Sequence, residues 1–134
     1  MSADPTDSLT LLGNTVRGAV DAGGLETFPA PAGIGVVRFR TAELTAFCPV
    51  TAQPDLYAMD FGYLPDDRCL ESKSFKLYLH SFRDRGIFCE TLAVTLLQDL
   101  VAVLRPRAAT VRLEQQVRGG LVLHAQADHE GGVR

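Results

Sequence analysis

Two groups that can do chemistry lie close together in the stretch from Phe47 to Asp55, Phe-Cys-Pro-Val-Thr-Ala-Gln-Pro-Asp. Cys48 offers a thiol, which is a nucleophile once it loses its proton, and Asp55 offers a carboxyl group that can give or take one. Pro49 and Pro54 fix φ and disfavour helix at the residue before them, so the stretch is predicted to be a stiff loop. An isolated cysteine is more often a small buried hydrophobe, and these residues alone leave that interpretation open.

The composition is typical of one ordinary globular domain, with 134 residues of which 46% are hydrophobic and 22% charged. No apolar run approaches the roughly 18 residues that a membrane span needs, and the first residues lack the pattern of a secretory signal. We therefore expect a cytoplasmic protein with no membrane partner. A net charge of -3 argues against direct binding to nucleic acid. Cys48, Cys69 and Cys89 show no CxxC spacing, so neither a disulfide framework nor a metal site is predicted.

The first half of the chain is expected to supply an extension and two strands. Residues 1–32 are rich in Gly, Pro, Ala and Thr and are predicted to form an irregular N-terminal extension. Residues 34–40 have the β-branched character of a strand, with 41–46 as a short connection into the Cys48 loop. Residues 56–64 place aromatic and apolar side chains on alternate positions, which predicts a second, antiparallel strand.

Two helices and two more strands are expected next. Phe75, Tyr78, Leu79 and Phe82 form one apolar stripe at helical spacing, and Gly86 is predicted to cap this helix. A second helix over 90–104 should end at Arg105 and Pro106. Residues 109–114 and 121–128 alternate as two strands joined around Gly119-Gly120.

The predicted order ββααββ makes an α+β fold, a four-stranded antiparallel sheet with both helices on one face. We place a single domain at 33–128 and a C-terminal tail at 129–134. Such a sheet has two free edges, and pairing with another chain is a usual way to cover them. A homo-oligomer is therefore expected.

Several segments together resemble the QueF family of nitrile reductases in its short single-module form. The segments are the Cys48 loop, Leu70-Glu71-Ser72-Lys73-Ser74-Phe75-Lys76-Leu77-Tyr78-Leu79, Ser81-Phe82-Arg83, Glu90 and Arg118-Gly119-Gly120, with Leu11-Leu12-Gly13-Asn14, Leu25-Glu26-Thr27-Phe28-Pro29 and Phe39-Arg40 through Phe47 nearer the N-terminus. The similarity spans roughly residues 11 to 125. It implies the tunnelling fold (T-fold), whose subunits join their sheets into a barrel with active sites at subunit boundaries.

The resemblance also implies an activity and its chemistry. The family reduces 7-cyano-7-deazaguanine to 7-aminomethyl-7-deazaguanine with NADPH, on the route to the modified tRNA base queuosine. Cys48 matches the nucleophile, whose addition to the electrophilic nitrile carbon gives a covalent thioimidate. Asp55 matches the acid that protonates the nitrogen, and for this role it has to hold a proton near neutral pH.

Binding residues are carried over in the same way. Glu90 matches the glutamate that recognises the purine, and a carboxylate can accept two hydrogen bonds from a guanine-like base. The substrate-binding set is Leu70, Glu71, Ser72, Cys89 and Glu90. The NADPH-binding set is Lys73, Ser74 and Lys76, with Arg118 on weaker support. Without the resemblance, Glu90 and the two lysines would be read as solvated surface charges.

Two positions depart from the family pattern. Cys89 stands where the family has a histidine that is thought to assist proton delivery, and a thiol is a poorer proton carrier near pH 7. Ala52 stands where the family usually has glycine, which matters only if that position needs a positive φ. These departures leave three alternatives open: a related enzyme that adds ammonia to the same thioimidate or takes another nitrile, a non-catalytic purine-binding module, and, ranked last, a zinc-dependent cyclohydrolase of the same fold.

Overall fold

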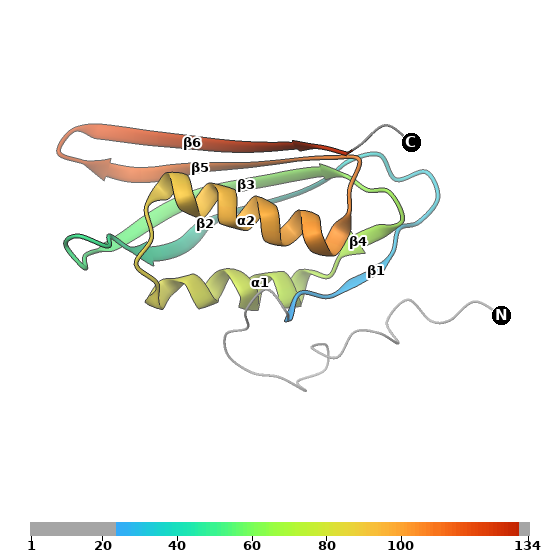
Figure 1. The fold of residues 1–134 in the computed structure, drawn as a ribbon, viewed down its shortest axis with the longest axis horizontal. Helices are drawn as coiled ribbons and strands as arrows, with labels where there is room; N and C mark the ends of the chain where they lie inside the picture. The colour runs from blue at the N-terminus through green and yellow to red at the C-terminus, as the bar shows by residue number, and fades with distance from the viewer. Residues whose placement is uncertain (1–23, 132–134) are drawn as a thin grey trace.

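The computed structural model describes residues 24–131, and Figure 1 shows one layer of strands covered on one face by two helices. The elements in chain order are β1 Thr27–Pro29, β2 Val37–Phe47, β3 Pro54–Leu64, β4 Arg68–Leu70, α1 Ser72–His80, a 3-10 helix η3 Ser81–Asp84, α2 Cys89–Leu104, β5 Ala108–Arg118 and β6 Leu121–Glu130. The main sheet runs β2-β3-β5-β6 with every neighbouring pair antiparallel. The predicted α+β fold and the order of its main elements are confirmed.

Strand β3 shows why the sequence folds this way. Its side chains alternate between buried and accessible, with Tyr57, Met59, Phe61 and Tyr63 facing the helices. Helix α2 adds a buried stripe that includes Leu92, Leu96, Leu97, Leu100 and Leu104. The two apolar surfaces meet as one core, and together they fix which face of the sheet the helices cover.

Strand β2 differs from its prediction. One strand spans Val37–Phe47, so residues 41–46 are not a connection, and residues 34–36 precede the strand. The register with β3 shifts between Thr41 and Leu44, a bulge that restores Leu44 and Ala46 to the buried face. Such a shift interrupts the simple alternation that identifies a strand in sequence.

A second, two-stranded sheet lies in a region expected to be irregular. Thr27–Pro29 of β1 pairs with Arg68–Leu70 of β4, and Leu25 is buried in the core. The N–H of Glu26 also donates to the hydroxyl of Ser74 at 3.0 Å. The part of 1–32 that the structure describes is therefore tied to the start of α1, and β6 continues two residues beyond the predicted strand end at 128. The remainder of the extension, residues 1–23, lies outside the described residues.

The helix ends have defined causes. The carboxylate of Glu71 accepts hydrogen bonds from the N–H groups of Lys73 and Ser74, both at 2.6 Å, and so caps α1. The sequence predicted that Gly86 ends α1, and this prediction is wrong. The helix ends at His80, and the chain continues as η3. Arg105 ends α2 in the left-handed conformation with φ of 46°, which confirms the predicted stop. Within residues 24–131, no helix is long and apolar enough to cross a membrane.

Truncating Leu96 tests the helix-to-sheet core, because its side chain is fully buried. We expect Leu96→Ala to lower the free energy of unfolding by about 2–5 kcal/mol through lost burial and a new cavity. Val94→Ala on the same helix is the matched control, since Val94 is 45% exposed, and should change it by less than about 0.5 kcal/mol. Urea unfolding measures both, and equal effects would contradict this packing.

Candidate active site

The loop that carries Cys48 is held in a fixed shape from both sides. The N–H of Cys48 donates to the carbonyl of Gln53, and the N–H of Ala52 donates to the carbonyl of Cys48, both at 2.9 Å. Just before the loop, Phe47 forms a parallel bridge with Gly86, so the segment leading into α2 lies beside the cysteine. Ala52 has a φ of 58°, so this position does require the left-handed backbone that glycine adopts most easily. The stiff loop predicted from the prolines is therefore a hydrogen-bonded turn that includes a strained alanine.

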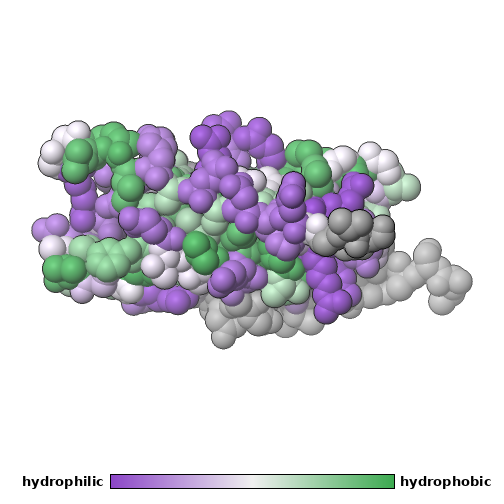
Figure 2. Space-filling view, turned by 45° about the horizontal axis from the view of Figure 1, so that its top comes forward, coloured by the Kyte–Doolittle hydropathy of each residue, from purple (hydrophilic) through white to green (hydrophobic). Residues whose placement is uncertain are grey.

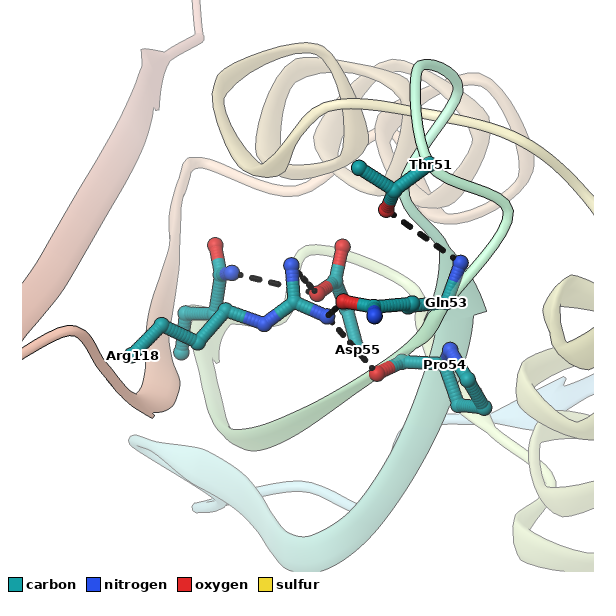
Figure 3. A network of polar contacts seen from close by, with 6 residues as sticks. Thr51, Gln53, Pro54, Asp55 and Arg118 are labelled. Atoms are coloured by element: carbon teal, nitrogen blue, oxygen red, sulfur yellow. Dashed lines mark hydrogen bonds and ion pairs between the residues drawn. The ribbon is translucent and has the colours of Figure 1, made fainter.

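The loop also favours the reactive form of the thiol. Cys48 is partly exposed, unlike a buried structural cysteine. A hydrogen bond from the Thr51 hydroxyl, assisted by the backbone N–H groups of Thr51 and Val50, lowers the pKa of Cys48 below its ordinary value. Thr51 is itself oriented, because its hydroxyl oxygen accepts from the N–H of Gln53 at 3.3 Å (Figure 3). These contacts stabilise a thiolate, the form that attacks electrophiles.

Asp55 is buried next to this loop and is paired with a guanidinium. Only 5% of its surface is exposed, and its Oδ1 lies 2.8 Å from Nη1 of Arg118 (Figure 3). The amide of Gln115 donates to the same oxygen at 3.2 Å. Arg118 also donates to the carbonyl of Pro54 at 3.2 Å. Arg118 and Gln115 therefore both bind Oδ1 of Asp55, and the guanidinium occupies the side of the carboxylate that a substrate would otherwise contact.

The first turn of α2 supplies two more of the predicted residues. Glu90 is exposed there, while Cys89 is buried at 2% exposure. Burial, together with the nearby charges of Glu90 and Asp55, raises the pKa of Cys89 to about 11. Cys89 therefore stays a neutral thiol and neither competes with Cys48 as nucleophile nor carries protons near neutral pH. Phe88, the residue before it, exposes 54% of its surface and offers an aromatic face beside Glu90.

A second group of predicted site residues lies at the end of the fold opposite to the Cys48 loop. Leu70, Glu71, Ser72, Lys73 and Ser74 surround the start of α1. Helix α1 has nine residues, about 13 Å in length, and runs from β4 toward the end of the molecule that holds the β2–β3 loop and the start of α2 (Figure 1). One chain thus brings together Cys48, Asp55, Cys89, Glu90 and Arg118, and it keeps Leu70 to Ser74 apart from them.

The second group has its own chemistry. The Glu71 carboxylate is buried and already accepts two N–H groups of its helix, so it is committed to capping. Lys76 is exposed and Lys73 partly so, and neither forms an ion pair with any residue from 24 to 131. Ammonium groups bind phosphates, which is the role predicted for these two lysines. Lys73 and Lys76, rather than the capped helix terminus, would then supply that contact.

Three residues at the site were not predicted from the sequence: Thr51, Gln115 and Tyr57. Thr51 lies within the reactive loop, and a hydroxyl three residues after a cysteine could have been recognised as a thiolate donor. Gln115 pairs across the sheet with Tyr57, and Tyr57 follows Asp55 by two positions on the same face of β3. That placement depends on the register between β3 and β5, which the sequence alone does not give.

Comparison with known proteins agrees with this architecture, an antiparallel sheet backed by two helices with a cysteine and a buried carboxylate at one end. The model of the family described as QueF-like protein matches residues 54–132. The chain belongs to this family. It is 44% identical to the NADPH-dependent 7-cyano-7-deazaguanine reductase of Syntrophus aciditrophicus, over 96% of this chain and 93% of that protein. The reductase of the same name from Frankia casuarinae is 43% identical over 91% of this chain and 96% of that protein.

A solved structure shows the same fold. The crystal structure of the archaeosine synthase QueF-Like in the apo form superposes with a TM-score of 0.68 and 28% sequence identity. The match covers 76% of this chain and 99% of that one. The predicted T-fold is consistent with this neighbour. Within residues 24–131, no group of three or more His, Cys, Asp or Glu side chains is arranged to hold a metal ion.

Alkylation with iodoacetamide at a series of pH values tests the difference between the cysteines. Cys48 should be modified first, because Cys69 and Cys89 are buried. Its rate rises with pH as the thiol loses its proton, and the lowered pKa places this rise at lower pH than for a free thiol. Thr51→Val should move the rise to higher pH and slow the reaction at pH 7 on the order of tenfold. Thr110→Val is the control, because Thr110 lies on the face of the sheet away from the helices. A Thr51→Val rate profile equal to that of wild type would contradict the role of Thr51 in lowering the pKa of Cys48.

Proposed function

We propose that this chain reduces the nitrile of 7-cyano-7-deazaguanine to the amine with NADPH, in the biosynthesis of queuosine. The observation that carries the proposal is the partly exposed Cys48, its pKa lowered by the Thr51 loop, beside the buried Asp55. The relatives named as this reductase match nearly the whole chain at 43–44% identity. Their names supply the substrate and the cofactor, and the geometry supplies the nucleophile.

The residues divide the reaction between them. The Cys48 thiolate attacks the nitrile carbon, a carbon–sulfur bond forms, one nitrile π bond breaks, and Asp55 gives the nitrogen a proton. NADPH, when bound, supplies the hydrides that reduce the carbon. Glu90 accepts hydrogen bonds from the purine, and the exposed ring of Phe88 gives a planar base a surface to stack on. Lys73 and Lys76 hold cofactor phosphates.

The proposed active site is shared between two copies of the chain. Leu70 to Ser74 lie at one end of the fold and Cys48 at the other, so one molecule cannot present both to one substrate. Strand β6 is an edge of the sheet, and Figure 2 shows hydrophobic surface at the end of the molecule where its hairpin lies. The exposed residues there include Val117, Leu121, Val122 and Leu123. A ten-residue edge strand with an exposed apolar end is suited to pairing with another chain.

One alternative has a specific observation behind it. The structural neighbour is named an archaeosine synthase, so a QueF-like fold also serves a second activity. A chain of that type would use the same Cys48 adduct with an acceptor such as ammonia. The lower identity of 28%, against 44% for the reductase, favours reduction.

Intact-mass measurement with the nitrile tests the proposal. Incubation should add one substrate mass to the protein, Cys48→Ala should abolish the addition, and NADPH absorbance should then fall with wild-type protein and Cys69→Ala but not with Cys48→Ala. Cys69→Ala is the control, because Cys69 is buried and belongs to no predicted site. An adduct without NADPH oxidation would favour the ammonia-type or non-catalytic alternatives. Absence of any adduct would remove the nitrile chemistry altogether.

Mixing two inactive variants tests the shared site. Cys48→Ala and Lys73→Ala each remove one end of the proposed site, so each alone should be inactive or nearly so. Co-refolded or co-expressed, the two chains should recover activity, because some boundaries then contain an intact Cys48 and an intact Lys73. No recovery in mixed oligomers would contradict a site built from two chains, and co-purification of the two variants through different affinity tags establishes that the mixed oligomers form.

A further inference from the structure

The hydroxyl of Tyr57 stands out within residues 24–131. It is the only buried side-chain nitrogen or oxygen there that has no hydrogen-bond partner. Tyr57 is 2% exposed, so water does not satisfy it from the surface. Burying a polar group without a partner destabilises a fold, and such a group needs a reason to be there. The other core tyrosines differ: the Tyr78 hydroxyl donates to Asp99 at 2.6 Å, and the Tyr63 hydroxyl accepts from the N–H of Leu70 at 2.8 Å.

The position of Tyr57 ties it to Asp55. The two residues are two positions apart on β3, and both are buried on its helix-facing side. Across the sheet, Tyr57 pairs with Gln115, the residue whose amide donates to Asp55. Burial, then the charge of the nearby Asp55, raise the pKa of Tyr57, while the charge of Arg118 opposes them. The Tyr57 hydroxyl is thus a neutral hydrogen-bond donor, and the charges of Asp55 and Arg118 act on it.

Asp55 is a buried carboxyl group that needs a second hydrogen-bond partner if Arg118 moves away. Its only described charged partner is Arg118, whose side chain is 39% exposed. Proton donation to the nitrile requires Asp55 to be protonated, and the guanidinium contact favours the opposite state. When Arg118 leaves, a carboxyl group that is 5% exposed needs another partner. A phenol is suited to this, because it can accept from a protonated carboxyl group and donate to a charged one.

We propose that Tyr57 is a positioning residue for Asp55, whose hydroxyl hydrogen-bonds to the Asp55 carboxyl group when Arg118 has moved away. The inference rests on the proposed nitrile chemistry. Asp55 accepts a proton from water, is held by Tyr57, and passes that proton to the nitrogen as Cys48 bonds to the carbon. The carboxylate that remains can pair with Arg118 again. Tyr57 gives up no proton in the net reaction.

Charged and polar groups from three parts of the chain surround this pair. Asp55 and Tyr57 face Arg118 and Gln115 from β5, Cys89 and Glu90 from α2, and Cys48 from the loop. Without the Tyr57 hydroxyl, Arg118 and Gln115 would be the main remaining partners of Asp55. The carboxyl group would then be held less well toward the nitrile nitrogen, so proton transfer should be slower.

Tyr57→Phe, compared with Tyr78→Phe as the matched control, tests this role in the full-length enzyme with 7-cyano-7-deazaguanine and NADPH. We expect Tyr57→Phe to lower kcat at pH 7 about tenfold and to leave KM for the nitrile within twofold. Tyr78→Phe should keep the wild-type kcat, because its hydroxyl bonds to Asp99 away from the site. Wild-type kcat in Tyr57→Phe would overturn the proposal.

Two further measurements separate positioning from structure. Tyr57→Phe removes an unpaired hydroxyl, so it should unfold at the same or a higher temperature than wild type, whereas Tyr78→Phe loses a hydrogen bond and should unfold at a lower one. In an Asp55→Asn background, Tyr57→Phe should cost nothing further in the rate of Cys48 adduct formation. A lower unfolding temperature in Tyr57→Phe would overturn the positioning role of Tyr57. So would a further loss in the rate of adduct formation when Tyr57→Phe is added to Asp55→Asn. If wild-type protein forms no adduct at all, the proposed function fails and takes this inference with it.

Discussion

The ion pair between Asp55 and Arg118 is the interaction on which the candidate site depends. A carboxylate that is 5% exposed needs a partner, and the guanidinium at 2.8 Å provides it. This contact joins the start of β3 to the end of β5, and so it also fixes the point where the Cys48 loop leads into β3 (Figure 3). The same contact occupies the carboxyl group that the proposed mechanism uses as its acid. The proposed mechanism therefore includes a movement of Arg118 away from Asp55.

The two cysteines at this end show how local surroundings separate chemical roles. Cys48 lies in a turn whose hydroxyl and N–H groups stabilise a thiolate, and Cys89 lies under the first turn of α2 beside two carboxylates. The same side chain is thus made reactive in one place and inert in the other. Because Cys89 holds its proton, the proposed mechanism assigns proton donation to Asp55 and the groups around it. That conclusion gives the unpaired hydroxyl of Tyr57 its significance.

The order of elements was predictable because buried and exposed positions alternate cleanly in β3 and repeat at helical spacing in α2. Cys48, Asp55 and Glu90 were predicted as site residues from their residue types and from the resemblance to a family. The sequence did not reveal the bulge in β2, the pairing of β1 with β4, or the end of α1, which depend on contacts between distant segments. Arg118 was expected at the cofactor and lies on Asp55, and Tyr57 was expected only as a strand residue. Both placements follow from the β3–β5 register, which is a tertiary property.

A crystal structure of the protein soaked with 7-cyano-7-deazaguanine, without NADPH, tests the central claim most directly. The account predicts continuous density from Sγ of Cys48 to the former nitrile carbon, with Arg118 withdrawn from Oδ1 of Asp55 and the Tyr57 hydroxyl within hydrogen-bond distance of that carboxyl group. A nitrile bound without a bond to sulfur would contradict the covalent chemistry. A bonded nitrile with Arg118 still on Asp55 would contradict the exchange of partners.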